Sequence, residues 1–274
     1  MPELPEVETV RRGLEHWSLG TTIVKAQTFH PRATNPRSLS KISSLSGARI
    51  TALSRRGKFL WFELDRPQTL VAHLGMSGQF RIQDPLVPKE KHLRARLVLD
   101  SHRELRFIDQ RTFGWLAVSE MNGDVPDLVK AIAPDIFDPA FAAPFVIERI
   151  RSKRTEIKRA LLDQNLMSGV GNIYADESLW LAKIHPQSAC DSLTKSKVKT
   201  LLSAVETVMS KALLEGGTSF DSLYTNVNGE SGYFERSLEA YGRENENCSR
   251  CDSQIRRIIV GGRSSHFCPR CQRF

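Results

Sequence analysis

Short apolar-rich segments recur throughout residues 21–120, and several of them alternate apolar and polar positions. The segments TTIVKAQTF, ARITAL, KFLWFEL, TLVAHL, GQFRI, RARLVLD, ELRFID and FGWLAVS are rich in β-branched or aromatic residues, and Gly, Pro, Asp and Ser separate them. Such runs are typical of β-strands, and the alternation indicates strands with one buried face. The pattern therefore predicts about eight antiparallel strands that form a sandwich or a flattened barrel.

A helical repeat of apolar residues precedes the strands. Val7, Val10, Leu14 and Trp17 recur at steps of three and four, which predicts one amphipathic helix. Pro5 suits the first position of this helix, because its missing N–H would have no partner there.

Helical periodicity returns after residue 151. TEIKRALLDQN predicts one helix, a glycine-containing turn follows at 168–171, and Asn172 is placed to cap a second helix over NIYADESLWLAKI. A longer helix is expected over residues 194–215. The proline-rich residues 121–150 predict the crossing between two domains.

Composition adds a candidate partner. The 274 residues suffice for one large domain or two of ordinary size, and 40% hydrophobic with 26% charged residues describes a soluble globular protein. We find no apolar run long enough to span a membrane. The net charge of +8 favours a polyanionic partner, nucleic acid first, although many basic proteins bind no nucleic acid.

Four of the five cysteines form two C-x-x-C pairs, Cys248 with Cys251 and Cys268 with Cys271. This spacing predicts a structural zinc site with four thiolate ligands, and disulfides are the competing interpretation. The opening MPELPEVETV is neither a secretory leader nor a transit peptide, which favours zinc. Cys190 is then an ordinary reduced thiol, and we expect a reducing compartment, most simply the cytoplasm.

Two basic features are candidates for phosphate contact. Between the cysteine pairs, QIRRIIVGGRSSHF predicts a hairpin whose tip carries Arg263, either as a phosphate ligand or as a solvated side chain on a zinc-bound end. The glycine turn at 168–171 has a basic cluster beside it, which favours a grip on a nucleic-acid backbone over a merely solvated face. The cluster consists of Lys153, Arg154, Lys158 and Arg159.

Pro2 and Glu3 raise a chemical alternative at the N-terminus. Removal of Met1 would leave the secondary amine of Pro2 as the α-amino group, with a pKa near 8. Such an amine can add to an aldehyde-like carbon and form an iminium, and Glu3 beside it can donate a proton. The residues alone leave open whether Pro2 has this role or none.

Five motifs in register resemble the bacterial formamidopyrimidine-DNA glycosylase family over essentially the whole chain. They are PELPEVETVRRGL at the start, HLGMSG at 73–78, DQRTFG at 109–114, GVGNIYADE at 169–177 and the terminal cysteine finger. The resemblance implies removal of 8-oxoguanine and ring-opened purines from DNA. A related family, endonuclease VIII, acts on oxidised pyrimidines and usually opens PEGPE, so PELPE favours the purine enzyme.

The resemblance also implies an α+β fold: an N-terminal β-sandwich flanked by helices, then a helix-two-turn-helix domain with a zinc finger. The domains expected are 1–132 for the catalytic sandwich, 133–150 for a linker, 151–235 for the helix-two-turn-helix domain and 236–274 for the zinc finger. One structural Zn²⁺ is the expected cofactor, and duplex DNA with oxidised bases or abasic sites the expected partner. A bacterial, nucleoid-associated monomer is implied.

By the same resemblance, the Pro2 amine attacks C1′ of the damaged nucleotide and Glu3 acts as general acid during base release. Lys58 matches a lysine that assists β-elimination, and Arg263 an arginine tied to δ-elimination and phosphate grip. The further DNA contacts fall into two groups. Met76, Arg111 and Phe113 match side chains inserted where a flipped nucleotide leaves the stack, whereas His92, Arg154 and Asn172 match backbone contacts.

The chain departs from the family pattern at a few positions. HLRARL lacks a second histidine beside His92, Arg154 stands where lysine is common, and Thr112 replaces a frequent arginine. These differences put in doubt only the salt dependence and the preference for the opposite base. The loop near 218–232 matches a segment that closes over an extruded base. Alternatives are a pyrimidine-preferring glycosylase of the same fold and a zinc-finger protein that binds damaged DNA without cutting it.

Overall fold

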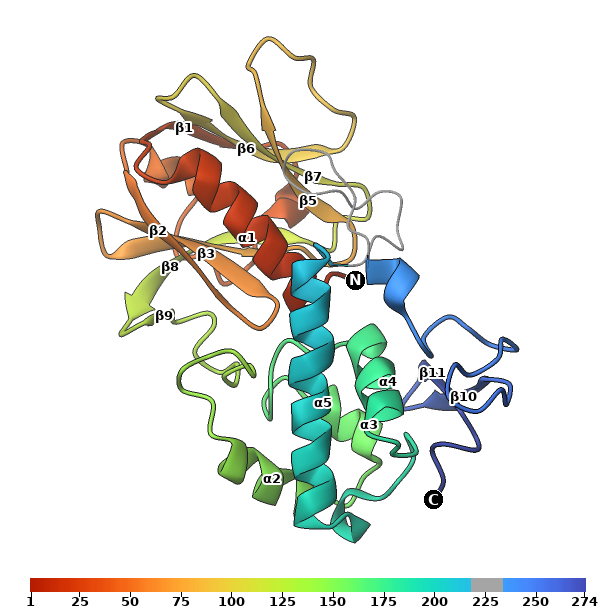
Figure 1. Cartoon of the computed structure of the whole chain (residues 1–274). Coiled ribbons are helices and arrows are strands. Elements are labelled where there is room, and N and C mark those ends of the chain that lie inside the picture. The colour runs from red at the N-terminus through yellow and green to blue at the C-terminus, as the bar shows by residue number, and fades with distance from the viewer. Residues whose placement is uncertain (218–233) are drawn as a thin grey trace. The chain divides into compact units, whose positions relative to one another are not determined.

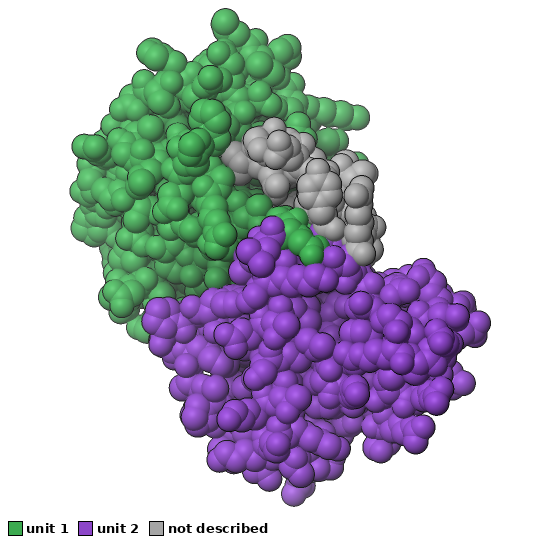
Figure 2. Space-filling model, viewed as in Figure 1, with its two compact units in different colours: residues 1–131, 215–233 green, residues 132–214, 234–274 purple. Residues whose placement is uncertain are grey.

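The computed structural model describes residues 1–217 and 234–274 and divides into two compact units (Figures 1 and 2). Unit 1 contains Met1–Ala131 and Glu215–Tyr233, and unit 2 contains Ile132–Leu214 and Phe234–Phe274. The predicted closing loop near 218–232 lies outside the described residues.

Two antiparallel sheets build unit 1. The four-stranded sheet has the order β1 (Ile23–Thr28), β6 (Leu93–Leu99), β7 (Glu104–Asp109) and β5 (Gly78–Gln83). The five-stranded sheet has the order β2 (Ile50–Arg56), β3 (Phe59–Leu64), β4 (Gln68–His73), β8 (Trp115–Asn122) and β9 (Val125–Pro126). The strands predicted from alternation are confirmed as β1 to β8. The two-residue β9 is too short to produce an alternating pattern.

The core of unit 1 lies between the two sheets, which confirms the predicted sandwich. Phe62 of the five-stranded sheet meets Phe80 of the other, with ring centroids 6.0 Å apart, and Phe80 meets Phe107 at 5.1 Å. Edge and tilted contacts of this kind are favourable beyond the apolar area that they bury. Helix α1 (Leu4–Ser18) contacts β2, β3 and β5 and thereby touches both sheets (Figure 1).

Helix α1 differs from its prediction at both ends. It begins at Leu4 rather than at Pro5, because Glu3 is the N-cap and forms a reciprocal capping box with Glu6. At the other end, Trp17 is 41% exposed and lies outside the core that Val7, Val10 and Leu14 enter. The guanidinium of Arg103 lies over its ring, so Trp17 is a surface aromatic.

Unit 2 combines helices with one hairpin. Its helices are α2 (Ala143–Arg151), α3 (Ile157–Leu161), α4 (Asn172–Leu181) and α5 (Lys195–Leu214), and its strands are β10 (Arg256–Val260) and β11 (Arg263–Phe267). The long helix expected at 194–215 is confirmed as α5, which packs on α2 and α4. The hairpin predicted between the cysteine pairs is also confirmed, with Gly261 and Gly262 at positive φ in its turn.

Two local predictions in unit 2 were wrong. Helix α3 ends at Leu161, well before Asn165, because the Asp163 carboxylate accepts the backbone N–H of Asn165 and turns the chain. Gly171, not Asn172, is the N-cap of α4, so Asn172 is the first helical residue and its side chain is available for other contacts. Helix α2 was not predicted.

None of the helices within the two described ranges has the length and hydropathy that a bilayer-spanning segment requires.

Candidate functional site

The two N-terminal residues proposed for chemistry are both buried beside the start of α1. Glu3 is 3% exposed, and its backbone N–H donates to Oε2 of Glu6 at 2.9 Å. Pro2 comes directly before this cap and is buried, whereas Met1 is 52% exposed. The positive end of the helix dipole therefore lies next to Pro2 and the Glu3 carboxylate, where negative charge is favoured.

An ion-pair cluster fastens α1 to the hairpin that carries Lys58. The Glu8 carboxylate binds Arg11, Arg12 and Arg55 at 2.8–3.2 Å. Burial alone would raise the pKa of Glu8, but the hydrogen bonds and charges of the three arginines outweigh it and lower this pKa. Arg55 also donates to the carbonyl of Gly57, at the turn between β2 and β3. Lys58, 6% exposed, follows in that turn.

His73 is a neighbour of Lys58 that the sequence analysis did not single out. It pairs with Phe59 across β3 and β4, and its ring stacks on Trp115 with centroids 5.7 Å apart. Nδ1 accepts the backbone N–H of Gly75, which leaves Nε2 to carry the proton of the neutral ring. Burial and the charge of Lys58 lower the pKa of His73 to about 4. Its only sequence signal was its place at the head of HLGMSG.

The three side chains predicted to fill the DNA stack lie on two loops of unit 1. Met76 is half-buried between β4 and β5, whereas Arg111 and Phe113 are exposed between β7 and β8. The guanidinium of Arg111 lies 5.5 Å from the centre of the Phe113 ring. His92 is half-buried at the start of β6, and its Nδ1 lies 3.3 Å from Nη2 of Arg94. Unit 1 thus brings these four residues onto neighbouring strand ends.

The predicted basic cluster of unit 2 separates into buried and exposed members. Lys158 is fully buried, and its Nζ binds Oδ1 of Asp176 at 2.6 Å and the carbonyl of Ser264 at 2.7 Å. Its predicted place in a grip on the DNA backbone was therefore wrong, because it is an internal tie between α3, α4 and β11. Lys153 is bound to Asp163 at 2.9 Å, and Arg154 is exposed.

Asn172 and Arg263 lie near the glycine turn of the hairpin. The Asn172 amide donates to the carbonyl of Ser264, next to Arg263 at the start of β11. Its Oδ1 is buried and has no hydrogen-bond partner among the described residues. Arg263 is exposed, and within the described ranges no hydrogen bond or ion pair is formed by its side chain or by that of Arg154. The side chains of Arg154 and Arg263 can therefore engage a ligand without breaking a bond that the structure contains.

Helix α4 holds the C-terminal finger along one face. Asp176 accepts the Ser265 hydroxyl and the His266 backbone N–H, both at 2.8 Å. Glu177 accepts the backbone N–H groups of residues 239–241 at 2.7–2.9 Å, and burial raises the pKa of its carboxyl despite these three donors. One turn later, Trp180 Nε1 donates to Sγ of Cys248 at 3.4 Å.

The four cysteines of the finger converge on one point. The sulfur atoms of Cys248, Cys251, Cys268 and Cys271 all lie within 4.8 Å of one another. Tetrahedral Zn²⁺ with Zn–S bonds of about 2.3 Å requires sulfur atoms about 3.8 Å apart, so the cluster fits one zinc ion. Four protein ligands leave no open position, and the metal is structural. Cys190 is buried elsewhere, and burial raises the pKa of its thiol to about 11, which keeps it unreactive.

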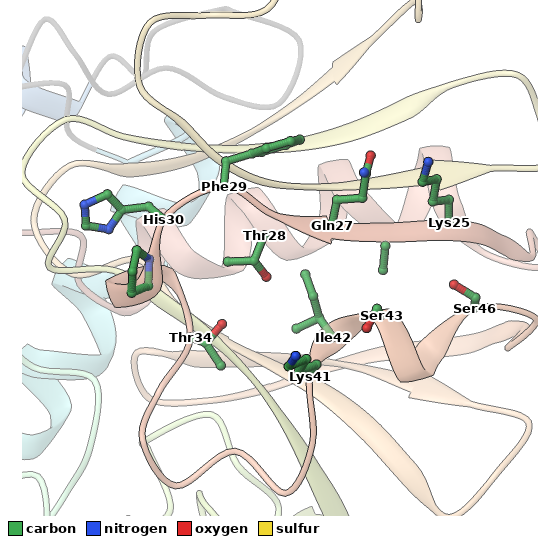
Figure 3. A pocket seen from close by; sticks show the side chains of 12 residues that line it. Lys25, Gln27, Thr28, Phe29, His30, Thr34, Lys41, Ile42, Ser43 and Ser46 are labelled. Atoms are coloured by element: carbon green, nitrogen blue, oxygen red, sulfur yellow. The ribbon is translucent and has the colours of Figure 1, made fainter.

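A separate hollow of about 870 Å³ lies beside β1 (Figure 3). Residues of β1, of η1 (Pro31–Ala33) and of η2 (Ile42–Leu45) contribute to its lining, and Thr28 and Ile42 project into it. None of the predicted site residues of unit 1 lines this hollow, so its volume says nothing about the candidate site.

Comparisons with known proteins match the chain along its length. The formamidopyrimidine-DNA glycosylase N-terminal domain matches residues 1–116, the formamidopyrimidine-DNA glycosylase H2TH domain residues 132–223, and the zinc finger found in FPG and IleRS residues 245–273. The formamidopyrimidine-DNA glycosylase of Nocardioides sp. is 54% identical, covering 99% of this chain and 94% of that protein. That of Rhodococcus erythropolis is also 54% identical, covering 99% and 97%.

The chain belongs to the formamidopyrimidine-DNA glycosylase family.

Solved structures of this family share the fold. A mutant of Lactococcus lactis Fpg, in complex with DNA containing Fapy-dG, is 36% identical with a TM-score of 0.91, covering 100% of both chains. Thermus thermophilus MutM (Fpg) is 39% identical with a TM-score of 0.87, covering 99% of this chain and 98% of that chain. The predicted α+β fold, with its N-terminal sheets, helix-two-turn-helix domain and zinc finger, is confirmed.

Proposed function

We propose that this chain is a bifunctional DNA glycosylase and abasic-site lyase that removes oxidised purines from duplex DNA. The observation that carries the proposal is the buried Pro2–Glu3 pair at the N-terminus of α1, in a chain of this family. Related structures of L. lactis Fpg hold DNA with Fapy-dG and DNA with an abasic site. Residues 1–132 supply Pro2, Glu3, Lys58 and part of the DNA contacts, residues 151–235 bind DNA, and residues 236–274 bind DNA and supply Arg263. The enzyme acts as a monomer in the bacterial cytoplasm.

The chemistry begins once Met1 is removed and the Pro2 amine is free. The amine nitrogen forms a bond to C1′ of the damaged nucleotide, the bond from C1′ to the base breaks, and Glu3 supplies a proton during base release. Opening of the sugar gives an iminium on Pro2. Loss of a C2′ proton then expels the 3′ phosphate, assisted by Lys58. In a second elimination, with Arg263 at the phosphate, loss of the C4′ proton expels the 5′ phosphate.

The remaining residues hold the DNA. Arg154, His92 and Asn172 contact the backbone, with Asn172 donating through its amide N–H group because phosphate oxygens only accept. Met76, Arg111 and Phe113 fill the gap left by the flipped nucleotide. The zinc ion holds the hairpin that presents Arg263, because the four cysteines flank β10 and β11 on both sides.

Borohydride trapping on a duplex with 8-oxoguanine opposite cytosine tests this function. Protein with a processed N-terminus should give a covalent adduct, and Pro2→Gly should give much less. A correctly processed protein that binds the duplex but yields no adduct would establish the non-catalytic binder instead.

A second substrate class has one observation in its favour. Wild-type L. lactis Fpg has been crystallised with DNA that contains an oxidised pyrimidine. Excision from 8-oxoguanine and from thymine-glycol duplexes should therefore be compared side by side. Faster release of thymine glycol would reverse the purine preference proposed here.

A further inference from the structure

The loops that carry Met76, Arg111 and Phe113 pack backbone against backbone. A Cβ atom added to Gly75 would lie 2.4 Å from the carbonyl carbon of Phe113 and 2.4 Å from the nitrogen of Gly114. Gly75 also has φ +62°, which disfavours any side chain there. A displacement of either loop is therefore transmitted to the other by direct contact.

One buried carboxylate joins the two loops. Asp109, the last residue of β7, is fully buried, and its Oδ1 accepts the hydroxyl of Ser77 at 2.6 Å. The same oxygen accepts the backbone N–H of Arg111 at 3.2 Å, and Oδ2 accepts that of Gly114 at 2.7 Å. Ser77 follows Met76, and Gly114 follows Phe113. Arg111 is thus bonded to Asp109 directly, whereas Met76 and Phe113 each precede a residue that is bonded to it.

The backbone of Asp109 reaches the fourth DNA-contact residue of unit 1. Its N–H donates to the carbonyl of His92 at 3.0 Å, and its own carbonyl accepts Nε of Arg94 at 2.7 Å. Arg94 Nη2 in turn lies 3.3 Å from the His92 ring. Asp109 is therefore the point at which the supports of Met76, His92, Arg111 and Phe113 meet.

The carboxylate suits this position for a chemical reason. Three donors converge on its two oxygens, and an ionised carboxylate accepts at both while donating at neither. An asparagine of the same shape would place an NH₂ group against an N–H or a hydroxyl and leave a buried donor unsatisfied. Thr112, held at φ +54° between two of these bonds, occupies a region that β-branched residues rarely adopt.

We propose that Asp109 is a positioning residue that makes Met76, Arg111 and Phe113 enter the DNA stack as one rigid unit. The inference rests on the proposed function, and it concerns the filling of the gap rather than the chemistry at Pro2. Asp109 does not touch the reacting atoms. It determines whether the inserting side chains arrive together, which decides how long the damaged nucleotide stays outside the stack.

The test compares Asp109→Asn with the wild type on two substrates. Excision of 8-oxoguanine from a duplex needs the gap to be filled, whereas strand cleavage at an abasic site in single-stranded DNA needs the chemistry of Pro2, Lys58 and Arg263 but leaves no gap to fill. We expect duplex excision to fall roughly ten- to a hundredfold, the range that a misplacement of about 1 Å can cause. Cleavage of the single strand should stay at the wild-type rate.

Two further variants make the comparison decisive. Ser77→Ala removes one of the three donors to the carboxylate, together with the hydroxyl that accepts the Arg111 backbone N–H at 3.0 Å, and should show a smaller selective loss. Asp127→Asn changes an exposed aspartate of the same unit and is the matched control. A 2-aminopurine placed beside the lesion should show a smaller fluorescence rise with Asp109→Asn, because the neighbouring base remains stacked.

The outcomes separate this inference from the proposed function. Equal excision by Asp109→Asn and the wild type would overturn the positioning role while leaving the glycosylase intact. A proportional fall on both substrates would also overturn it, since Asp109 would then support the fold alone. Absence of any trapped adduct with the wild type would instead refute the proposed function.

Discussion

At the scale of single residues, burial and a neighbouring charge decide whether His73 can become protonated. Burial and the charge of Lys58 lower the pKa of His73 to about 4, whereas an unperturbed histidine has a value of 6.5. Between these two values the unfolded chain binds a proton that the folded chain does not. The stability of unit 1 therefore falls as the pH drops from 6.5 towards 4, and above 6.5 this contribution is constant.

Replacing His73 with Asn should weaken this acid sensitivity. One pKa unit corresponds to about 1.4 kcal/mol, and the ring is only half-buried. We therefore expect the free energy of unfolding of the wild type to fall by roughly 1–3 kcal/mol through His73 as the pH drops from 6.5 to 4. Thermal unfolding of the wild type and of His73→Asn at pH 7.5, 6 and 4.5 shows how steeply the stability of each protein falls with pH. His102→Asn, at an exposed histidine of the same unit, is the control. Parallel curves for wild type and His73→Asn would contradict the lowered pKa.

The role of a residue could be predicted when its partners lie close to it in the sequence, and could not when they lie far away. The four cysteines could be predicted because both C-x-x-C pairs are local, and one ion defines their geometry. The roles of Asp109 and His73 could not be predicted, since their partners Ser77 and Lys58 lie in turns elsewhere in the chain. Their roles depend on strand register, which alternation alone does not fix.

At the scale of elements, the strands were the most predictable part and the short helices the least. Alternation identified strands such as β6, which buries every second residue, whereas β3, β4 and β7 were identified as short apolar runs because they are buried on both faces. Helix α3 was overestimated, and Lys158 within it was taken for a surface cation. A lysine on a helix looks the same in sequence whether it faces solvent or a buried carboxylate on another helix.

Helix α4 should depend strongly on that buried pair. Lys158→Met leaves the Asp176 charge without its cation, and we expect unit 2 to lose about 3–5 kcal/mol of unfolding free energy. Adding Asp176→Asn should recover part of the loss, because the uncompensated charge is removed. Chemical denaturation measures both, with the exposed Lys199→Met as control. A Lys158→Met protein as stable as the control would show that the pair contributes nothing.

At the scale of the whole molecule, the positive charge and the zinc finger are both features suited to binding DNA. A net charge of +8 gives an attraction to DNA that depends on salt, and the cysteine-bound hairpin carries Arg263, which we propose contacts phosphate. The sequence indicated both features. It could not show that α4 holds the finger through Asp176, Glu177 and Trp180, since these contacts join segments far apart in the chain.

Loss of one zinc ligand should weaken DNA binding without unfolding unit 1. We expect Cys248→Ser to reduce zinc content and to lower affinity for a lesion duplex at least about tenfold, which corresponds to 1.4 kcal/mol. Metal analysis and binding titrations at one fixed salt concentration measure the two effects. Cys190→Ala, at a buried thiol outside the cluster, is the matched control. Unchanged affinity despite lost zinc would show that the finger does not position Arg263.

The most direct test of the mechanism is to map the crosslink itself. After borohydride reduction on an 8-oxoguanine duplex, the protein is digested and the peptide that carries the sugar is sequenced by mass spectrometry. We expect a deoxyribose remnant on the nitrogen of Pro2, in a peptide that lacks Met1. A remnant on Lys58 or any other side chain, or full activity in protein that keeps Met1, would contradict it.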